Sequence, residues 1–331
     1  VYKDNNPVLY DTEFKKYKAA EAIASDSFKR SDVISSFNNF EPRFSLSYTL
    51  DDQTSIKASY NRMAQYLHLL SNTSSPAPLD VWTPSGKYIK PQLLDQFAIG
   101  YFKFLKDGDY SIETEAFYKD IQNRIDYING ANLVANNEIE TVILNGKARA
   151  YGLEILVKKN QGKLKGWLAY TLSKSEQLTA GRTLNEPGIN NGEWYNTPYD
   201  KTHDFSINAS YELNKKWKFN TNFVFQTGQP TNYPVGQYEV QSLNVPIYND
   251  NSRNSDRLPA YHRLDISATL NPEKNNKRKW QAEWVFGIYN VYGRQNAASV
   301  NFSQNRETSR NEAVQTAIFG LVPSVTYNFK F

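Results

Sequence analysis

The sequence lacks several features that would place it in a common class of proteins. It has no cysteine, so neither a disulfide framework nor a thiolate metal site is possible. It has no run of about eighteen apolar residues, which excludes transmembrane helices. The net charge is only +4 over 331 residues, which argues against nucleic acid as the main partner. A membrane protein remains possible, because β-barrel strands are only half apolar and lower the mean hydropathy, here −0.65.

Histidine is scarce as well, and the sequence shows no catalytic or metal-binding motif. His68, His203 and His262 are far apart in the chain, and none has a second histidine or a carboxylate at ligand spacing. A G-x-S-x-G motif and a glycine-rich phosphate loop are both absent. We therefore predict no enzyme activity, no catalytic residues, no metal and no cofactor, and we expect His203 and His262 on the surface.

Tyrosine is abundant, with 23 residues, and the C-terminal segment shows how the aromatic residues are arranged. Successive side chains of a strand point to opposite faces, so alternation gives one apolar face and one polar face. The apolar set is Val325, Tyr327, Phe329 and Phe331, and the polar set is Ser324, Thr326, Asn328 and Lys330. A soluble sheet can show this pattern, but a strand between lipid and a wet lumen requires it.

The same alternation recurs along the chain and predicts about eleven antiparallel strands. They cover residues 43–50, 55–60, 92–105, 110–119, 151–158, 168–172, 205–213, 217–225, 263–270, 280–288 and 320–331. Connections of roughly three to nine residues alternate with connections of roughly ten to thirty, as in outer-membrane barrels with short periplasmic turns and long external loops. We therefore predict an all-β fold, an antiparallel transmembrane β-barrel in the outer membrane.

Strand parity then predicts the topology of the chain. With a periplasmic C-terminus, the long loops are extracellular and residues 1–39 form an external segment, in which residues 15–24 (KKYKAAEAIA) are candidates for a helical turn. Residues 40–331 supply the barrel strands. An odd strand count cannot close a single-chain bacterial barrel, so we expect only part of a barrel. Val1 is not a start methionine, which indicates a processed chain or a fragment.

Several motifs resemble the barrel of TonB-dependent outer-membrane receptors, particularly those of the Bacteroidetes type. The resemblance extends over essentially the whole chain beyond Phe40, and the order and spacing of the motifs are more specific than any single one. The motifs are EPRFSLSYTL (41–50), AYGLE (150–154), PYDKTHD (198–204), TGQP (227–230) followed by YPVGQY (233–238), RLPAYHRLD (257–265), NVY (290–292) and the terminal VTYNFKF (325–331).

The resemblance implies a barrel of about 22 strands. This barrel is closed by an N-terminal plug and is coupled to the TonB complex. Eleven strands are half of that barrel, in agreement with the parity argument, and the sequence contains neither plug nor TonB box. The implied partners are the outer-membrane bilayer, the rest of the same receptor (the plug and the N-terminal strands) and, through that part, the TonB complex. A surface lipoprotein is a further candidate partner.

Charged residues on the inward face form a ladder that points to the lumen. Contact with a plug or a substrate path is one interpretation, and a solvated lumen wall, which any wide barrel needs, is the other. Arg43, Arg263 and Asp265 are the better candidates for contact because they lie in the motifs that resemble the family. The ladder consists of Arg43, Lys57, Glu113, Glu115, Glu154, Arg263 and Asp265.

Aromatic residues in the long loops are the candidate ligand contacts, because loops on a rigid scaffold carry recognition. Their rings can stack on sugars or pack on hydrophobic chelates, and they can equally pack the loops against one another. The candidates are Trp82, Trp194, Tyr195, Tyr233, Tyr238 and Tyr248. We assign Trp217, Trp280 and Trp284 to the membrane-facing surface or its aromatic girdles.

Two classes of function follow. The first is TonB-dependent active uptake of a scarce, large nutrient: an iron chelate, a glycan, a peptide or a vitamin. The second is a passive porin or a structural barrel subunit of a surface complex. A plug and a TonB box upstream of Val1 would belong only to the first.

Overall fold

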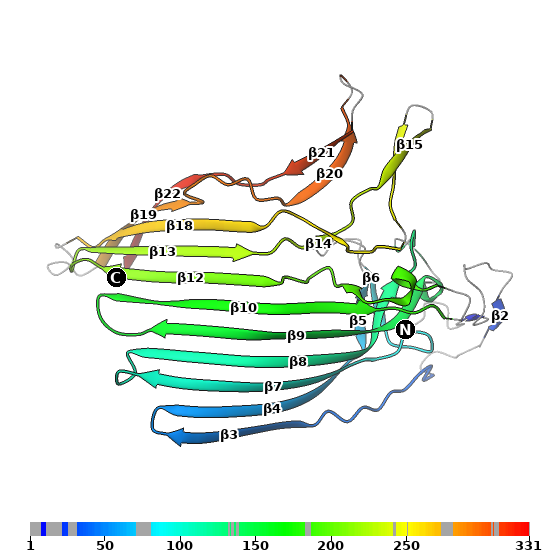
Figure 1. Ribbon diagram of the computed structural model, residues 1–331, viewed down its shortest axis with the longest axis horizontal. Coiled ribbons are helices and arrows are strands. Elements are labelled where there is room, and N and C mark those ends of the chain that lie inside the picture. The colour runs from blue at the N-terminus through cyan, green and yellow to red at the C-terminus, as the bar shows by residue number, and fades with distance from the viewer. Residues whose placement is uncertain are drawn as a thin grey trace.

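One large antiparallel sheet dominates the computed structural model, which describes residues 8–10, 22–25, 32–70, 81–131, 133, 136, 139–182, 187–240, 243–249, 251–272, 281–305, 307 and 311–330. Eleven strands follow one another around the sheet in chain order (Figure 1). The strands are β3 (Arg43–Asp51), β4 (Thr54–Gln65), β7 (Gln92–Leu105), β8 (Tyr110–Tyr127), β9 (Ile143–Lys159), β10 (Leu164–Leu178), β12 (His203–Glu212), β13 (Trp217–Gln226), β18 (Tyr261–Leu270), β19 (Gln281–Tyr289) and β22 (Val322–Lys330). The predicted all-β fold of about eleven antiparallel strands is confirmed.

The pairing register places the alternating side chains in continuous rows across the sheet. One row on the apolar face is Leu46, Ala58, Ile99, Ala116, Leu153 and Leu172. The next row, on the polar face, is Ser47, Lys57, Gly100, Glu115, Glu154 and Thr171. Leu46 is 70% exposed and Ile99 is 58% exposed. Such a broad exposed apolar surface is typical of a face that contacts lipid or another protein.

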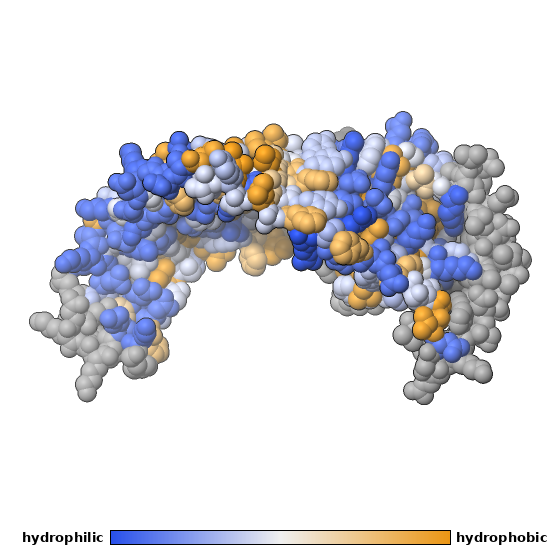
Figure 2. Space-filling model, turned by 90° about the horizontal axis from the view of Figure 1, so that it is seen from below, coloured by the Kyte–Doolittle hydropathy of each residue, from blue (hydrophilic) through white to orange (hydrophobic). Residues whose placement is uncertain are grey.

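The sheet is strongly curved, and seen from the side it forms an arch with a hollow beneath it (Figure 2). Apolar residues gather over the middle of the arch, and hydrophilic residues gather toward its two ends (Figure 2). This distribution matches the band of a membrane-crossing sheet, with polar ends on both sides of an apolar middle.

The two ends of the strands differ in their connections. At the short-turn end, residues 52–53, 106–109, 160–163, 213–216 and 271–280 join successive strands. At the long-loop end, the connections are residues 66–91, 128–142, 179–202, 227–260 and 290–321. The strict alternation that the sequence predicts is therefore present in the structure.

The long-loop end contains more regular structure than the sequence pattern predicts. Extra hairpins are formed by β5 (Leu67–Leu70) with β6 (Val81–Pro84), β15 (Gly236–Val240) with β16 (Leu243–Ile247), and β20 (Ser299–Gln304) with β21 (Asn311–Thr316). Short pairs join β14 (Pro230–Thr231) to β17 (Asp256–Arg257), and β11 (Tyr195–Asn196) to β10. Two short 3₁₀ helices are η2 (Ile139–Thr141) and η3 (Ile189–Gly192). Within the described ranges, no helix is long and apolar enough to cross a membrane.

Two expectations about the extent of elements are wrong. In the N-terminal segment, β1 (Val8–Tyr10) pairs with β2 (Ala22–Ser25), so the end of the candidate helical turn is a strand, and residues 15–21 lie outside the described residues. Strand β8 continues to Tyr127, and β9 begins at Ile143, well beyond the predicted ends. The strict alternation of the sequence does not extend to these strand ends, and in β8 the irregularity at Asn123 interrupts it.

Most of the buried apolar residues that the structure describes lie at the long-loop end, in the loops and in the adjoining end of β9, and Ala282 in β19 is an exception. One cluster consists of Leu70, Ile89, Leu133, Ile139 and Ile143, and a second consists of Leu144, Ile189 and Tyr195. These small cores hold the loops against the strand ends and so fix the walls of the cavity described next.

A candidate ligand site at the long-loop end

A cavity of about 860 Å³ opens between the strand ends and the long loops. Its lining combines tyrosine rings and carboxamide side chains with aliphatic and proline side chains, and it includes few charged groups. The lining residues used below are His68, Arg124, Asp126, Tyr127, Gln177, Tyr199, Asn232, Tyr248, Asn249 and Arg253. Its volume is in the range of about 300–1,000 Å³ that is usual for small-molecule sites.

A β-bulge in β8 positions two of the charged groups at this cavity. Asn123 has a φ of 56°, and the register of β8 against β9 shifts by one residue there. Its side-chain Nδ2 donates to the carbonyl oxygen of Pro91 at 2.8 Å, which stabilises the turned backbone. Beyond the bulge, Arg124 pairs with Gly146, which lies on the same face of β9 as Glu154, the polar face of the sheet. Strict alternation would have placed Arg124 and Asp126 on the apolar face, so the bulge redirects both toward the cavity.

Arg253, from the loop between β16 and β17, is held against this wall. Its Nη1 donates to Asp126 Oδ1 at 2.7 Å and to the carbonyl oxygen of Tyr127 at 2.9 Å, and its Nη2 donates to Asn129 Oδ1 at 2.5 Å. The guanidinium also lies 4.7 Å from the centre of the Tyr127 ring. The pair is largely buried, and the guanidinium donates to three acceptors in or next to β8, so it fixes the loop relative to β8.

Tyr195 completes this network from β11. Its hydroxyl donates to Asp126 Oδ2, and it is also within hydrogen-bond distance of Thr179 Oγ1 at 2.9 Å and Gln177 Nε2 at 3.0 Å. Tyr195 is 5% exposed, and burial together with the Asp126 carboxylate raises its pKa. The phenol therefore stays protonated and donates a hydrogen bond that orients the carboxylate.

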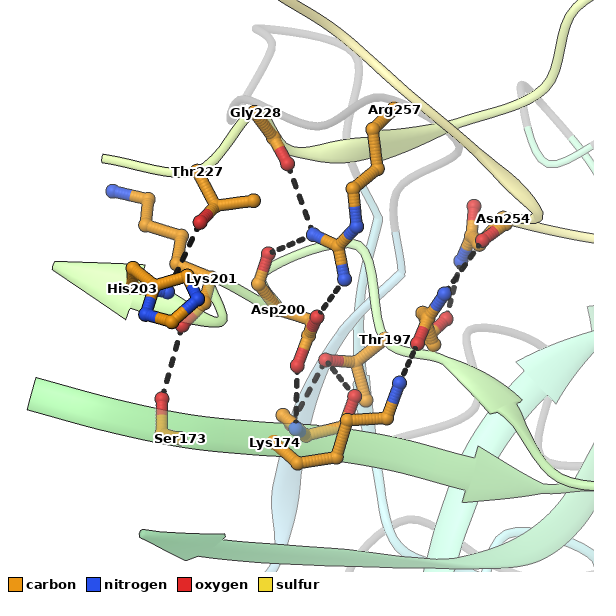
Figure 3. A network of polar contacts seen from close by, with 12 residues as sticks. Ser173, Lys174, Thr197, Asp200, Lys201, His203, Thr227, Gly228, Asn254 and Arg257 are labelled. Atoms are coloured by element: carbon orange, nitrogen blue, oxygen red, sulfur yellow. Dashed lines mark hydrogen bonds and ion pairs between the residues drawn. The ribbon is translucent and has the colours of Figure 1, made fainter. Parts of the chain in front are cut away.

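A second network ties two long loops to each other and to β10, as Figure 3 shows. Asp200 is fully buried, accepts from the backbone N–H of Ser175 at 2.6 Å and pairs with Arg257 Nη2. Arg257 Nη1 also donates to the carbonyl oxygen of Gly228 at 3.0 Å. A Cβ on Gly228 would lie 1.6 Å from the carbonyl oxygen of Leu258, so only glycine allows this approach. The motifs PYDKTHD, TGQP and RLPAYHRLD therefore meet at one place.

A third network closes the end of β18. Arg263 donates to Asp265 Oδ2 and to the hydroxyls of Tyr261 and Tyr289, at 3.0, 2.9 and 2.7 Å. Asp265 Oδ1 accepts from the backbone N–H of Asn290 at 2.9 Å. The predicted lumen-facing residues Arg263 and Asp265 therefore pair with each other, and Asp265 anchors the turn that begins at Asn290.

A family model described as TonB dependent receptor-like, beta-barrel, matches residues 10–291. The chain belongs to the TonB-dependent receptor family. This is an outer-membrane β-barrel family of receptors whose members import iron chelates and siderophores. The homologues are transport receptors rather than enzymes. A search of curated protein sequences found no relative.

Solved structures show the same fold at low sequence identity. The ferric-catecholate import receptor Fiu of E. coli K12 is 16% identical, with a TM-score of 0.53, and the match covers 86% of this chain and 34% of that one. The ferripyoverdine receptor of Pseudomonas aeruginosa is 15% identical, with a TM-score of 0.55, and the match covers 88% and 33%. The FrpB iron transporter of Neisseria meningitidis is 12% identical, with a TM-score of 0.51, and the match covers 88% and 39%. This receptor chain spans about a third of the length of the first two.

The predicted loop aromatics of the receptor occupy different kinds of position. Trp82 is 62% exposed on β6, and Tyr238 is exposed on β15. Tyr248 lines the cavity and is 47% exposed. Tyr233 is half-buried, with its hydroxyl donating to the carbonyl oxygen of Arg257 at 3.0 Å.

Trp194 and Tyr195 pack within the wall of the receptor rather than projecting from it. The Trp194 ring lies 4.1 Å from the Arg149 guanidinium and 5.6 Å from Lys147 Nζ. Arg149 in turn pairs with Glu176. The interactions given above for Tyr195 likewise direct its hydroxyl into the wall, so neither residue presents an open ring comparable to Tyr248.

The remaining predicted lumen residues lie on the polar face of the sheet. Glu115 and Glu154 are directly opposite one another on β8 and β9. Glu113 pairs with Lys158 at 2.6 Å. Arg43 lies 3.8 Å from Glu41 and stays largely exposed.

Sequence reasoning missed the residues that shape the cavity. Arg124, Asp126 and Gln177 lie beyond the predicted strand ends, and Arg253 lies in a long loop without periodicity. For Asp200 and Arg257 a signal existed, because both fall within motifs that resemble the family. No sequence signal links Arg253 to Asp126, which is 127 residues away.

Proposed function

We propose that this chain is the C-terminal part of the barrel of a TonB-dependent receptor that imports a scarce, large nutrient by active transport. The observation that supports this most directly is a ligand-sized cavity at the long-loop end of a sheet that belongs to this family. Proteins of similar fold are named as receptors for ferric catecholate and ferripyoverdine. In this proposal residues 40–331 supply barrel strands and residues 1–39 an external segment.

The polar face is the lumen wall in this proposal, next to a plug supplied by the rest of the receptor. Six residues on that face are Arg43, Glu113, Glu115, Glu154, Arg263 and Asp265. Glu115 and Glu154 are the strongest candidates for contact with a cationic group of a plug, because like charges directly opposite destabilise a sheet unless compensated. Arg263 and Asp265 instead compensate one another.

The loop aromatics supply ligand contacts in the same proposal. Tyr248 is the strongest of the predicted set, because it lines the cavity and keeps an exposed ring. Trp82, Tyr233 and Tyr238 would contribute from the surrounding hairpins, whereas Trp194 and Tyr195 would support the wall. The long loops are extracellular and the C-terminus is periplasmic in this arrangement, and the motifs favour a receptor of the Bacteroidetes type, with a surface lipoprotein as a possible further partner.

Depletion of nutrients from a defined medium tests the transport proposal. Cells with the intact gene, with the gene deleted and with TonB deleted are grown with ferric siderophores, oligosaccharides, peptides and cobalamin, and mass spectrometry follows each solute. We expect at least one solute to be depleted by the intact strain and spared equally by both deletion strains. Depletion that requires the receptor gene but persists without TonB would instead identify a passive porin.

Peptide mapping of the polypeptide from native outer membrane tests the partial-barrel proposal. We expect peptides from further strands and from a plug in the same gene product. A mature polypeptide that begins at Val1 would require closure by another chain and would remove the support for TonB coupling.

A further inference from the structure

The charges around the cavity leave one cation without a compensating anion. Arg253 is neutralised by Asp126 at 2.7 Å. Among the described residues Arg124 has no ion pair, and its contact there is to the neutral Gln92 Oε1 at 3.4 Å. His68 is 4% exposed and hydrogen-bonds Ser85 Oγ at 3.0 Å. A ligand with one carboxylate matches this balance, whereas a multiply charged ferric chelate would leave buried negative charge unpaired.

The hydrogen-bonding groups of the cavity are those that recognise hydroxyl groups. Both N–H groups of Gln177 are engaged, by Asp126 Oδ2 at 2.7 Å and by the Tyr195 hydroxyl at 3.0 Å, which fixes the orientation of the amide. Its Oε1 is buried without a partner among the described atoms. This acceptor requires a donor, and a ligand hydroxyl supplies one.

Two further amides have the complementary character. The Oδ1 atoms of Asn232 and Asn249 accept backbone N–H groups of their own loop, from Asn254 and Asn251. Anchored in this way, each amide keeps its NH₂ group available to donate within the described part of the lining. The cavity therefore presents acceptors and donors together, as the many hydroxyls of a sugar require.

Exposed aromatic rings complete the site. Tyr199 is 60% exposed and Tyr248 is 47% exposed, and both line the cavity. The flat apolar face of a sugar ring packs on such a ring while its hydroxyls reach neighbouring polar groups. Within the described part of the chain, no group of three or more His, Asp or Glu residues could hold a bare metal ion.

We infer that this cavity binds a short acidic oligosaccharide, with a uronic acid carboxylate at Arg124 and sugar faces against Tyr199 and Tyr248. Uptake of this ligand rests on the proposed function, whereas binding of the ligand to the cavity needs neither TonB nor energy. The hydroxyls are expected at Gln177, Asn232 and Asn249.

Binding to the purified full-length receptor in detergent tests the inference. The probes are an array of short oligosaccharides, neutral and uronic-acid-containing in several linkages, and a ferric tris-catecholate in solution. We expect binding to a subset of uronic acid oligosaccharides. Arg124→Gln should weaken it by about ten- to hundredfold, the loss expected for one charge-assisted hydrogen bond, and should spare neutral analogues. Tyr248→Ala should weaken acidic and neutral analogues alike.

A matched control removes a cation at the opposite end of the strands. Lys215→Gln lies in the turn between β12 and β13 and should leave binding unchanged. Binding of the ferric tris-catecholate with no uronic acid oligosaccharide bound, or no binding of any probe, would overturn the inference. Uptake that proves independent of TonB while uronic acid binding persists would overturn only the transport proposal.

Discussion

At the residue scale, the receptor concentrates its buried polar groups at the long-loop end. Asp126, Asp200 and Gln177 are each almost fully buried, and each has partners from other elements. A buried carboxylate is tolerated only where hydrogen bonds and a cation compensate for lost hydration. These residues therefore hold loops from distant parts of the sequence in fixed positions, and removing one partner leaves the other buried and unpaired.

The Asp126–Arg253 pair gives a first prediction. Asp126→Ala leaves the Arg253 guanidinium buried without its anion, so we expect a loss of about 3–5 kcal/mol in the stability of the cavity wall. Limited proteolysis of residues 251–254 should accelerate accordingly. Asp52→Ala, at an exposed short turn, is the control and should change stability by less than about 0.5 kcal/mol. Equal cleavage rates in the two variants would contradict a locking role for the pair.

His68 gives a prediction about pH. Burial, with a smaller contribution from Arg124, lowers the pKa of His68 below its ordinary 6.5. Because the pKa is lower in the folded state, the folded state binds the proton less well than the unfolded state. The contribution of neutral His68 to folding stability is therefore complete above about pH 6.5 and is lost as pH falls through the pKa of the folded state. The protection factors of the β5 and β6 amides, which are corrected for the intrinsic exchange rate at each pH, should therefore fall from pH 7 to pH 5. His68→Gln should remove that pH dependence, and retention of it would show that another group titrates.

At the element scale, the bulge in β8 decides which side chains reach the cavity. One extra residue reverses the parity of everything that follows it in the strand. Asn123 suits this position because asparagine tolerates a positive φ and its amide bonds the Pro91 carbonyl oxygen. The period of two that defines the sheet therefore continues beyond the bulge with its phase shifted by one residue, and the site begins there.

Asn123→Val tests the role of the bulge. A β-branched side chain disfavours the positive φ at residue 123, and regular alternation through that residue would direct Arg124 and Asp126 toward the apolar face, so the Arg253 contact should be lost. We expect faster proteolysis at residues 251–254, comparable to that of Asp126→Ala. Asn123→Gly is the matched control, because glycine keeps the positive φ and should preserve most of the protection. An Asn123→Val variant with wild-type protection would show that the bulge does not set the parity.

At the scale of the whole molecule, one end of the curved sheet carries all the long loops and the other carries short turns (Figure 1). The apolar face exposes large side chains over the middle of the arch (Figure 2). Burying that surface in lipid is favourable at roughly 25 cal/mol per Å² of apolar area. The proposed membrane orientation follows from these two asymmetries.

Labelling of single cysteines tests that orientation, and these 331 residues contribute no cysteine of their own. Asn251→Cys lies in a long loop and Lys215→Cys lies in a short turn. We expect a membrane-impermeant maleimide to label Asn251→Cys on intact cells and Lys215→Cys only after the outer membrane is opened. The reverse pattern would place the long loops in the periplasm.

Local sequence patterns are sufficient to predict the all-β fold, the strand order and the alternation of short turns with long loops. These properties follow from local alternation between apolar and polar side chains, which a sheet with two different surroundings imposes on each strand separately. The position and lining of the cavity, in contrast, become visible only in the folded chain. Its wall depends on a one-residue bulge and on contacts such as Arg253 with Asp126, which join residues that no local pattern relates. Tyr195 shows the same limit: an aromatic in a loop is compatible with a ligand contact or a buried anchor, and only the neighbours supplied by the fold distinguish the two.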